Sequence, residues 1–150
     1  MIIYLAAPLF TTAERNFNEA LAYQIKAISR GDIQLFLPQK AVFPEPISEA
    51  YSHGFIYRGC IDAIKESDGV LAVLDGSDAD SGTSFEVGYA VAIGKNCWSI
   101  RTDFRGSGDG WDRSTNIMLG ESTFMVKFDS RKHLLHEIAA GIVESIVGRQ

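Results

Sequence analysis

The chain has 150 residues, of which 46% are hydrophobic and 22% charged, so it is long enough for one domain with a sizeable core. Its formal net charge of −5 excludes a general electrostatic attraction to nucleic acid. The N-terminal segment Met1–Pro8 lacks the basic start of a signal peptide, and no apolar run approaches the roughly 18 residues of a membrane span. The cysteines, Cys60 and Cys97, indicate neither a disulfide framework nor a zinc site. We therefore expect a cytoplasmic protein with no membrane partner, no metal and no cofactor.

The first predicted elements are a strand and a helix. A β-rich run occupies Ile2–Ala6 and is followed by Thr11 and Glu14, whose spacing is that of a capping box at a helix start. Apolar residues then recur at helical spacing until Gly31-Asp32 interrupts the pattern. We expect a helix between these two points.

The same alternation of short and long apolar patterns continues to the C-terminus. Short apolar runs are typical of buried strands, and longer segments with helical spacing are typical of helices. Gly94 ends the third helix, and between the fourth and fifth strands we expect a loop. The remaining strands are predicted at Gln34–Leu37, Gly69–Leu74, Cys97–Arg101 and Thr123–Phe128, and the remaining helices at Ser48–Glu66, Ser81–Ile93 and Arg131–Val147.

This order of elements predicts a fold class. Strands that alternate with helices are typical of a parallel sheet with right-handed crossovers. We expect a single-domain, doubly wound α/β protein with a five-stranded parallel sheet in the flavodoxin-like order 2-1-3-4-5. Ligands of such sheets bind beyond the carboxyl ends of the strands, where the strand order reverses. The residues after the first, third and fourth strands are therefore the first candidates for a site.

Acidic residues crowd the turn after the third predicted strand. Asp75, Asp78 and Asp80 lie there, and Glu86 follows in the first turns of the next helix. Like charges this close destabilise a fold unless a ligand, hydrogen bonds or pKa shifts relieve them, so the cluster is a candidate site. The positive end of the helix dipole favours an ionised Glu86, and a carboxylate can act as a nucleophile. Two structural alternatives remain open: Thr83 and Glu86 have the spacing of a capping box, and the aspartates are common turn formers, which is our preferred interpretation of Asp78.

Four segments carry a family resemblance. They are Ile3–Phe10, Ile64–Asp68, Asp80–Ala90 followed by Gly94-Lys95, and Thr115–Leu119. With these segments in the expected order, the sequence resembles the nucleoside 2-deoxyribosyltransferase family over about residues 2 to 128. The resemblance implies one domain of that type over residues 1–150.

The resemblance implies an activity. It implies transfer of 2-deoxyribose between nucleobases, in which the glutamate that matches Glu86 attacks the anomeric carbon and forms a covalent glycosyl-enzyme intermediate. A free nucleobase then takes the sugar from the opposite face. The alternative is hydrolysis of a deoxynucleoside or its 5′-monophosphate through the same nucleophile. A non-catalytic binding domain is a third alternative, because this fold hosts many functions.

The resemblance also implies roles for the residues around Glu86. Tyr4 matches the tyrosine whose hydroxyl holds the nucleophile, and the less favoured alternative is an aromatic strand residue that packs in the core. Asp80 matches the carboxylate that binds the 5′-hydroxyl, and an aspartate there disfavours a 5′-phosphate. Gly82 and Phe10 lie in the matching segments and are expected to bind substrate. Asn116 matches an asparagine that reaches the site of a neighbouring subunit, which implies a homo-oligomer.

The sequence departs from the family at one position. Many relatives carry an aspartate that helps to protonate the leaving base at the position of Cys60. A thiol is a poor substitute for a carboxylic acid. Asp62 is the replacement candidate, although it lies roughly 200° further around a helix. The choice between purines and pyrimidines depends on variable loops such as residues 39–52, so the sequence leaves it open.

Other candidate motifs are weaker. The glycine-rich segment Gly106–Gly110 lacks the lysine and helix start of a phosphate-binding loop, so we interpret it as a loop. Phe104 and Trp111 flank it and are candidates to stack on a base. His133 and His136 do not have the spacing of a metal-binding helix, and we interpret them as part of a solvated helix face.

Overall fold

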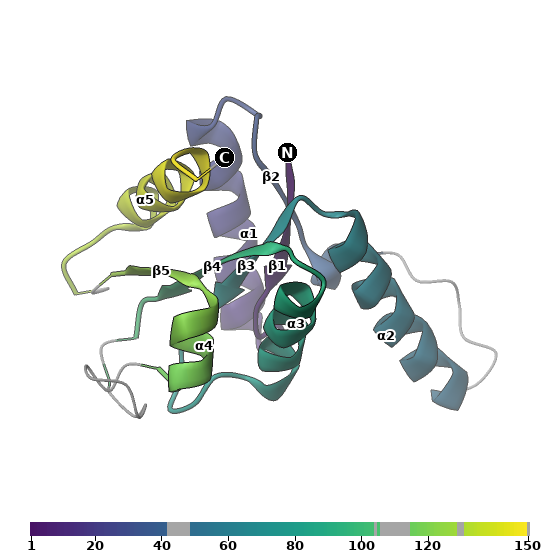
Figure 1. The fold of residues 1–150 in the computed structure, drawn as a ribbon. Coiled ribbons are helices and arrows are strands. Elements are labelled where there is room, and N and C mark those ends of the chain that lie inside the picture. Colours follow the sequence, from purple (N-terminus) through teal and green to yellow (C-terminus); the bar gives the residue numbers. More distant parts are fainter. Residues whose placement is uncertain (42–48, 104, 106–114, 129–130, 150) are drawn as a thin grey trace.

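A computed structural model gives the fold of the chain (Figure 1). It describes residues 1–41, 49–103, 105, 115–128 and 131–149, with the side chains of residues 49–52 left out. The candidate stacking residues Phe104 and Trp111 and the glycine-rich segment Gly106–Gly110 therefore lie outside the described residues. In the described part of the chain, no helix combines the length and the apolar composition needed to cross a bilayer.

A five-stranded parallel sheet forms the centre of the molecule. Its strand order is β2-β1-β3-β4-β5, which confirms the predicted 2-1-3-4-5 topology. The order reverses between β1 and β3, where the register pairs Tyr4 with Val70 and Ala6 with Ala72. The strands are β1 (Ile2–Ala6), β2 (Gln34–Phe36), β3 (Gly69–Val73), β4 (Asn96–Arg101) and β5 (Phe124–Lys127).

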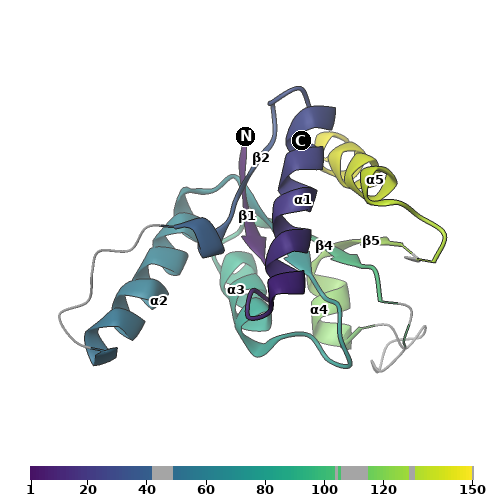
Figure 2. The ribbon, with the colours of Figure 1, turned by 180° about the vertical axis from the view of Figure 1, so that it is seen from behind.

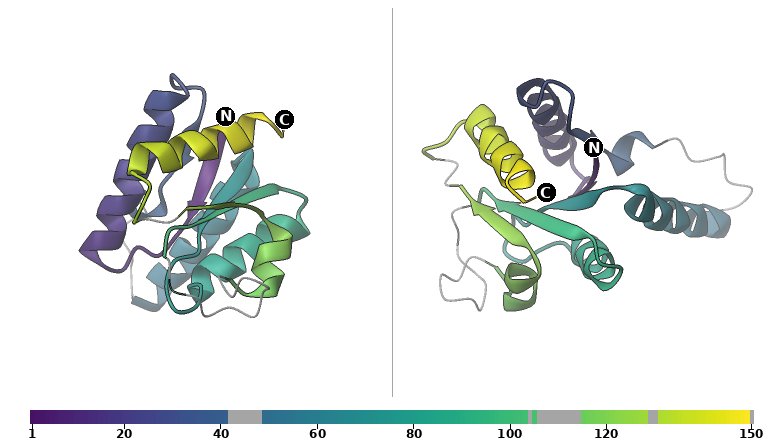
Figure 3. Two further views of the ribbon diagram at one scale, coloured as in Figure 1. Left: turned by 90° about the vertical axis from the view of Figure 1, so that its left-hand side faces the viewer. Right: turned by 45° about the horizontal axis from the view of Figure 1, so that its top comes forward.

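Helices cover both faces of this sheet. One face is covered by α1 and α5, which lie against each other, and the other face by α2, α3 and α4 (Figures 1 and 2). The N-terminal end of α2 extends away from the sheet (Figure 3). A short 3₁₀ helix, η1 (Pro38–Lys40), follows β2. The helices are α1 (Thr12–Ile28), α2 (Glu49–Glu66), α3 (Ser81–Ala92), α4 (Ile117–Ser122) and α5 (Leu135–Val147).

Alternation along the strands divides the core into two layers. Ile3 and Leu5 of β1 face the layer under α1 and α5, whereas Tyr4 and Ala6 face the layer under α2, α3 and α4. β3 is buried over its whole length, as expected for a central strand of a sheet covered on both faces. Each fully buried Leu, Ile or Val contributes roughly 1.5 to 3 kcal/mol relative to an exposed one. The chemistry-bearing side chain of β1, Tyr4, thus belongs to the α3 face.

Two helices differ from their predicted form. α4 occupies a segment that we expected to be a loop; it has six residues, too few to show a helical period in the sequence. α5 begins at Leu135 rather than Arg131, because Leu134 is extended and its N–H donates to the Glu137 carboxylate. At α1 the predicted capping box is confirmed: Thr11 N donates to Glu14 Oε2 over 2.7 Å, and Glu14 N donates to Thr11 Oγ1 over 3.2 Å.

Candidate active site

A pocket of about 320 Å³ lies beyond the carboxyl ends of β1 and β2. The start of α3 forms one wall, the segment after β1 and η1 form a second, and α2 forms a third. Four residues singled out from the sequence line it: Phe10, Asp80, Gly82 and Glu86. Cys60 lines it as well, from α2.

A buried tyrosine holds the glutamate of this pocket. Tyr4 is fully buried on β1, and its hydroxyl donates a hydrogen bond of 2.5 Å to Glu86 Oε1 on α3. Its ring stacks on that of Phe36 from β2, with ring centroids 5.7 Å apart. Tyr4 is therefore both a core residue and the partner of Glu86. Of the described residues, none donates to Glu86 Oε2, which leaves that oxygen for a ligand.

Burial shifts the acid–base behaviour of both groups. Loss of hydration raises the pKa of Glu86 from 4.5 to about 7, with the Tyr4 hydrogen bond acting in the opposite direction and the Asp80 charge in the same direction. Burial, and next the charge of Glu86, raise the pKa of Tyr4 far above its usual range, so Tyr4 remains a hydrogen-bond donor. Glu86 therefore changes charge near neutral pH.

The raised pKa of Glu86 predicts a pH-dependent stability. Between pH 4.5 and about 7 the folded state holds more protons at Glu86 than the unfolded chain, so the free energy of unfolding falls as pH rises through this window. Glu86→Gln removes this loss. We therefore expect the substitution to raise the free energy of unfolding, relative to the wild type, by roughly 1 to 3 kcal/mol more at pH 8 than at pH 4.5. Denaturant unfolding at both pH values measures it, with the exposed Glu121→Gln as the matched control. Equal stabilisation at both pH values would contradict the assignment.

Asp80 begins the helix that carries Glu86. Its Oδ2 accepts hydrogen bonds from Thr83 N over 2.8 Å and from Thr83 Oγ1 over 3.2 Å, so Asp80 is the N-cap of α3. Glu86 is the sixth residue of α3, too far along to close a capping box, and the Thr83–Glu86 capping box considered from the sequence is wrong. Asp80 Oδ1 accepts from none of the described residues and remains available at the pocket.

Gly82 and Phe10 bound the pocket on two sides. A Cβ at Gly82 would lie 3.1 Å from Asp80 Oδ2, so a side chain there would crowd the carboxylate. Phe10 is 72% exposed although it lines the pocket, which places an accessible ring at its rim. Both residues line the pocket, and their contact with substrate stays a prediction.

The structure does not bring Asp62 to the pocket. Its side chain is 62% exposed and pairs with Lys65 Nζ at 3.0 Å. Cys60, two residues earlier, is half-buried in the pocket wall beside Tyr4 and Glu86. Burial and the charge of Glu86 raise the pKa of the Cys60 thiol, whereas the hydrogen bond with Tyr4 lowers it. The net shift is upward, so the thiol is neutral. The helix spacing that argued against Asp62 in the sequence thus accounts for its position.

Asn116 lies outside the pocket of its own chain. It is the N-cap of α4, and its Oδ1 accepts from Met118 N over 3.0 Å. Its side chain is exposed, and the next two residues, Ile117 and Met118, are 49% and 72% exposed. Within the described part of the chain, Asn116 is therefore separate from Glu86.

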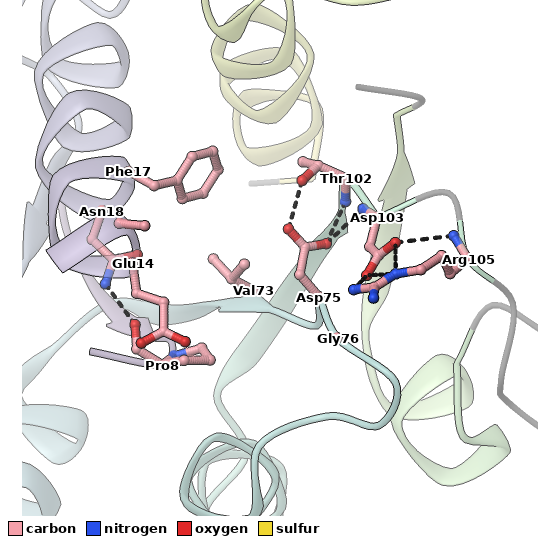
Figure 4. Close-up of a pocket in the computed structure, with 11 residues that line it drawn as sticks. Pro8, Glu14, Phe17, Asn18, Val73, Asp75, Gly76, Thr102, Asp103 and Arg105 are labelled. Carbon is pink, nitrogen blue, oxygen red and sulfur yellow. Dashed lines mark hydrogen bonds and ion pairs between the residues drawn. The ribbon is translucent and has the colours of Figure 1, made fainter. Parts of the chain in front are cut away.

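A second cavity, of about 650 Å³, lies on the α1 side of the same sheet edge (Figure 4). Asp75 lines it, but both of its oxygens accept hydrogen bonds from Thr102, at 2.6 Å from N and 2.5 Å from Oγ1. Asp103 pairs with Arg105, which lowers the pKa of Asp103 well below its usual range. Although larger, this cavity holds carboxylates already satisfied by the chain itself, so the smaller pocket with Glu86 is the candidate active site.

Two buried polar residues escaped the sequence analysis. Arg101 ends β4, and its guanidinium donates to the backbone oxygens of Leu74, Gly76 and Arg105, which ties the ends of β3 and β4 together. Asn18 of α1 is only 3% exposed. The sequence did contain a signal for each buried residue. Arg101 is a charged residue at the end of an apolar strand, and Asn18 is an asparagine on the apolar side of a helix. Of the described residues, no group of three His, Cys, Asp or Glu side chains is placed to hold a metal ion.

Comparison with known proteins identifies the family. Residues 3–133 match the family model of nucleoside 2-deoxyribosyltransferases. A protein of Ureaplasma parvum serovar 3, itself uncharacterized, is 33% identical over 115 residues, 69% of this chain and 71% of the relative. A conserved protein from Enterococcus faecalis V583 has a TM-score of 0.75 at 25% identity, covering 100% of this chain and 99% of that one. A 2-deoxyribosyltransferase from Leishmania mexicana has a TM-score of 0.64 at 28% identity, covering 95% and 97%.

The doubly wound five-stranded parallel sheet of this chain resembles the fold of the solved 2-deoxyribosyltransferase from Leishmania mexicana. The chain belongs to the nucleoside 2-deoxyribosyltransferase family. The resemblance noted in the sequence is thereby confirmed.

Proposed function

We propose that this protein transfers 2-deoxyribose between nucleobases, with Glu86 as the covalent nucleophile. The observation that carries the proposal is the 2.5 Å hydrogen bond from the buried Tyr4 hydroxyl to Glu86 Oε1 inside the pocket. A carboxylate fixed through one oxygen presents the other at a defined angle, which favours attack on a bound sugar. The proposed setting is nucleoside salvage in the cytoplasm, with no cofactor.

The reaction proceeds in two displacements. Glu86 Oε2 attacks C1′ while the C–N bond breaks, and its electron pair leaves with the nucleobase, which takes up a proton. The product of this step is a glycosyl ester on Glu86. A ring nitrogen of a second base then attacks C1′ from the opposite face, loses its proton and releases the carboxylate, so the configuration at C1′ is retained.

The protonation state of Glu86 sets the pH range of this chemistry. Only the ionised carboxylate is a nucleophile, and burial holds the pKa of Glu86 at about 7. A poorly hydrated carboxylate is also more nucleophilic than a solvated one. We assign Asp62 no role in protonating the leaving base, because its side chain is exposed and lies away from the pocket. Cys60 is a neutral thiol that borders the pocket and supplies no carboxylic acid.

The free oxygen of Asp80 supports free nucleosides as substrates. We assign Asp80 Oδ1 to the 5′-hydroxyl of the sugar, because Oδ2 is already committed to the N-cap. A 5′-phosphate at this position would face a carboxylate of like charge. The proposed substrate class is therefore the 2′-deoxynucleoside rather than its 5′-monophosphate.

Replacement of Asp80 by serine is expected to shift this preference. Serine is also a good N-cap, so α3 should keep its start while the negative charge is lost. We expect Asp80→Ser to lower kcat/KM for deoxynucleosides and to raise it for 5′-monophosphates, changing the ratio on the order of tenfold or more. Steady-state kinetics with both substrates measure the ratio. Asp80→Asn, which keeps shape and cap, is the control for charge alone, and an unchanged ratio in both variants would remove Asp80 from the 5′ end.

The activity itself is tested by incubating the protein with deoxyinosine and free adenine or cytosine. Chromatography then separates the products. A new deoxynucleoside supports the transferase, whereas free deoxyribose alone supports the hydrolase alternative. If deoxyinosine is unchanged under conditions where the protein is folded, the proposed function is wrong.

We also propose that the protein works as a homo-oligomer in which Asn116 completes the site of a neighbouring subunit. Two observations support this arrangement. Asn116 is exposed and lies outside its own pocket, and exposed apolar side chains, Ile117 and Met118, follow it directly. Such a surface suits burial against a symmetry-related copy.

A further inference from the structure

A buried carboxamide on α1 connects two segments of the pocket wall. Asn18 Nδ2 donates to the backbone oxygen of Pro8 and to Gln39 Oε1, each over 3.0 Å. Pro8 precedes the pocket residues Leu9 and Phe10, and Gln39 is itself a pocket residue on η1. One side chain therefore joins the segment after β1 to the segment after β2.

The orientation of both carboxamides follows from chemistry. A backbone carbonyl can only accept a hydrogen bond, so the atom of Asn18 that faces Pro8 O must be the nitrogen. The same reasoning holds for Gln39, whose Nε2 donates to Arg15 O over 3.0 Å and to Glu19 Oε1 over 3.2 Å. Both hydrogens of Gln39 Nε2 are thus used, and its Oε1 must face Asn18. Neither amide can flip without losing hydrogen bonds.

The rest of the network fixes the same wall from its outer side. Arg15 donates to the backbone oxygens of Leu9 and Phe10, both over 3.0 Å. Glu19, which accepts from Gln39, pairs with Lys40 at 2.9 Å on the protein surface. Asn18 is the buried member of this network, because only 3% of it is exposed. A buried amide nitrogen whose two hydrogens are both bonded is costly to disturb, so the position of Asn18 Nδ2 is well defined.

We propose that Asn18 is a positioning residue of the active site, which acts through Pro8 and Gln39 to hold the pocket wall formed by the segment after β1 and by η1 in a fixed position. The proposal rests on the proposed function in one respect, namely that the ligand of the pocket is a deoxynucleoside. Asn18 touches neither Glu86 nor Tyr4, so its loss should loosen ligand binding and leave the nucleophile unaffected. The expected signature is a higher KM with a nearly unchanged kcat.

A double-mutant cycle with Asn18→Ala and Gln39→Leu tests the proposal. We expect Asn18→Ala to raise KM for the deoxynucleoside on the order of tenfold and to change kcat less than about threefold. In the Gln39→Leu background the same replacement should change KM much less, because its partner is already gone. Asn16→Ala, an exposed asparagine two residues earlier on the same helix, is the matched control for helix stability.

A second measurement needs neither turnover nor a stable variant. In the wild-type protein, the NMR signals of the two carboxamide protons of Gln39 should be shifted from those of a solvated glutamine, and both protons should exchange slowly with water. In a folded Asn18→Ala or Asn18→Asp protein these signals should move. Signals at the positions of a solvated glutamine with fast exchange in the wild type would overturn the proposal, as would an unchanged KM in folded Asn18→Ala or full additivity in the cycle. A wild-type protein that turns over no deoxynucleoside would instead refute the proposed function, and the amide signals would then decide the role of Asn18.

Discussion

Glu86→Gln is expected to lower the turnover of deoxynucleosides by at least about three orders of magnitude while the protein stays folded. Glutamine fills the same space and can still accept the Tyr4 hydrogen bond, but its amide oxygen is a poor nucleophile. Burial raises the pKa of the native carboxyl group, so the neutral amide should be tolerated by the fold. The loss of activity would therefore reflect chemistry rather than unfolding.

The measurement combines kinetics with chemical trapping. Asp78→Asn is the matched control, because Asp78 is an exposed carboxylate near the same turn, and among the described residues its side chain accepts a hydrogen bond only from the adjacent Ala79 N–H. A 2-fluorinated arabinosyl nucleoside slows breakdown of the glycosyl ester, so mass spectrometry of the trapped protein should find the sugar on Glu86. Labelling of Asp80 instead, or near-normal activity of folded Glu86→Gln, would reverse the assignment.

The sheet was predictable because each element carries its own periodicity. The buried run at β3 and the capping box at Thr11 and Glu14 are local signals, and local signals survive in a single sequence. α4 escaped prediction because six residues cannot show a helical repeat, and a cap such as Asn116 is equally common in turns. The start of α5 was placed too early because the charged residues after 130 do not distinguish a helix from an extended approach to one.

The site was predictable only in part. Parallel strands end at one edge, so the meeting of Tyr4 and Glu86 was a reasonable expectation, and the family resemblance specified the pair. Whether Glu86 closes a capping box or is free to act as a nucleophile depends on the residue at which α3 begins. The sequence alone fixes that residue only to within a few positions. The contact of Asn18 with Gln39 joins residues far apart in sequence, and no local pattern reports such a contact.

The largest effect expected at a distance from the pocket is loss of activity on replacement of Asn116. Asn116→Ser should keep the N-cap of α4, because a serine oxygen can also accept from Met118 N, but it removes the amide that we assign to a neighbouring site. We expect turnover to fall on the order of a hundredfold in Asn116→Ser, with little change in unfolding temperature. Asn116→Ala loses the cap as well and separates the two contributions.

Mixing two inactive proteins gives the sharper result. In a hybrid of Glu86→Ala and Asn116→Ser subunits, one of the two sites at a two-fold interface draws both an intact Glu86 and an intact Asn116, while the other site has neither. Random exchange of equal amounts makes half of the dimers hybrid, so activity should return to about a quarter of the wild-type value. Each variant mixed with itself is the control, and exchange is verified with differently tagged subunits. Verified exchange without recovery, or full activity of a monomer in sedimentation at the assay concentration, would show that Asn116 does not act across an interface.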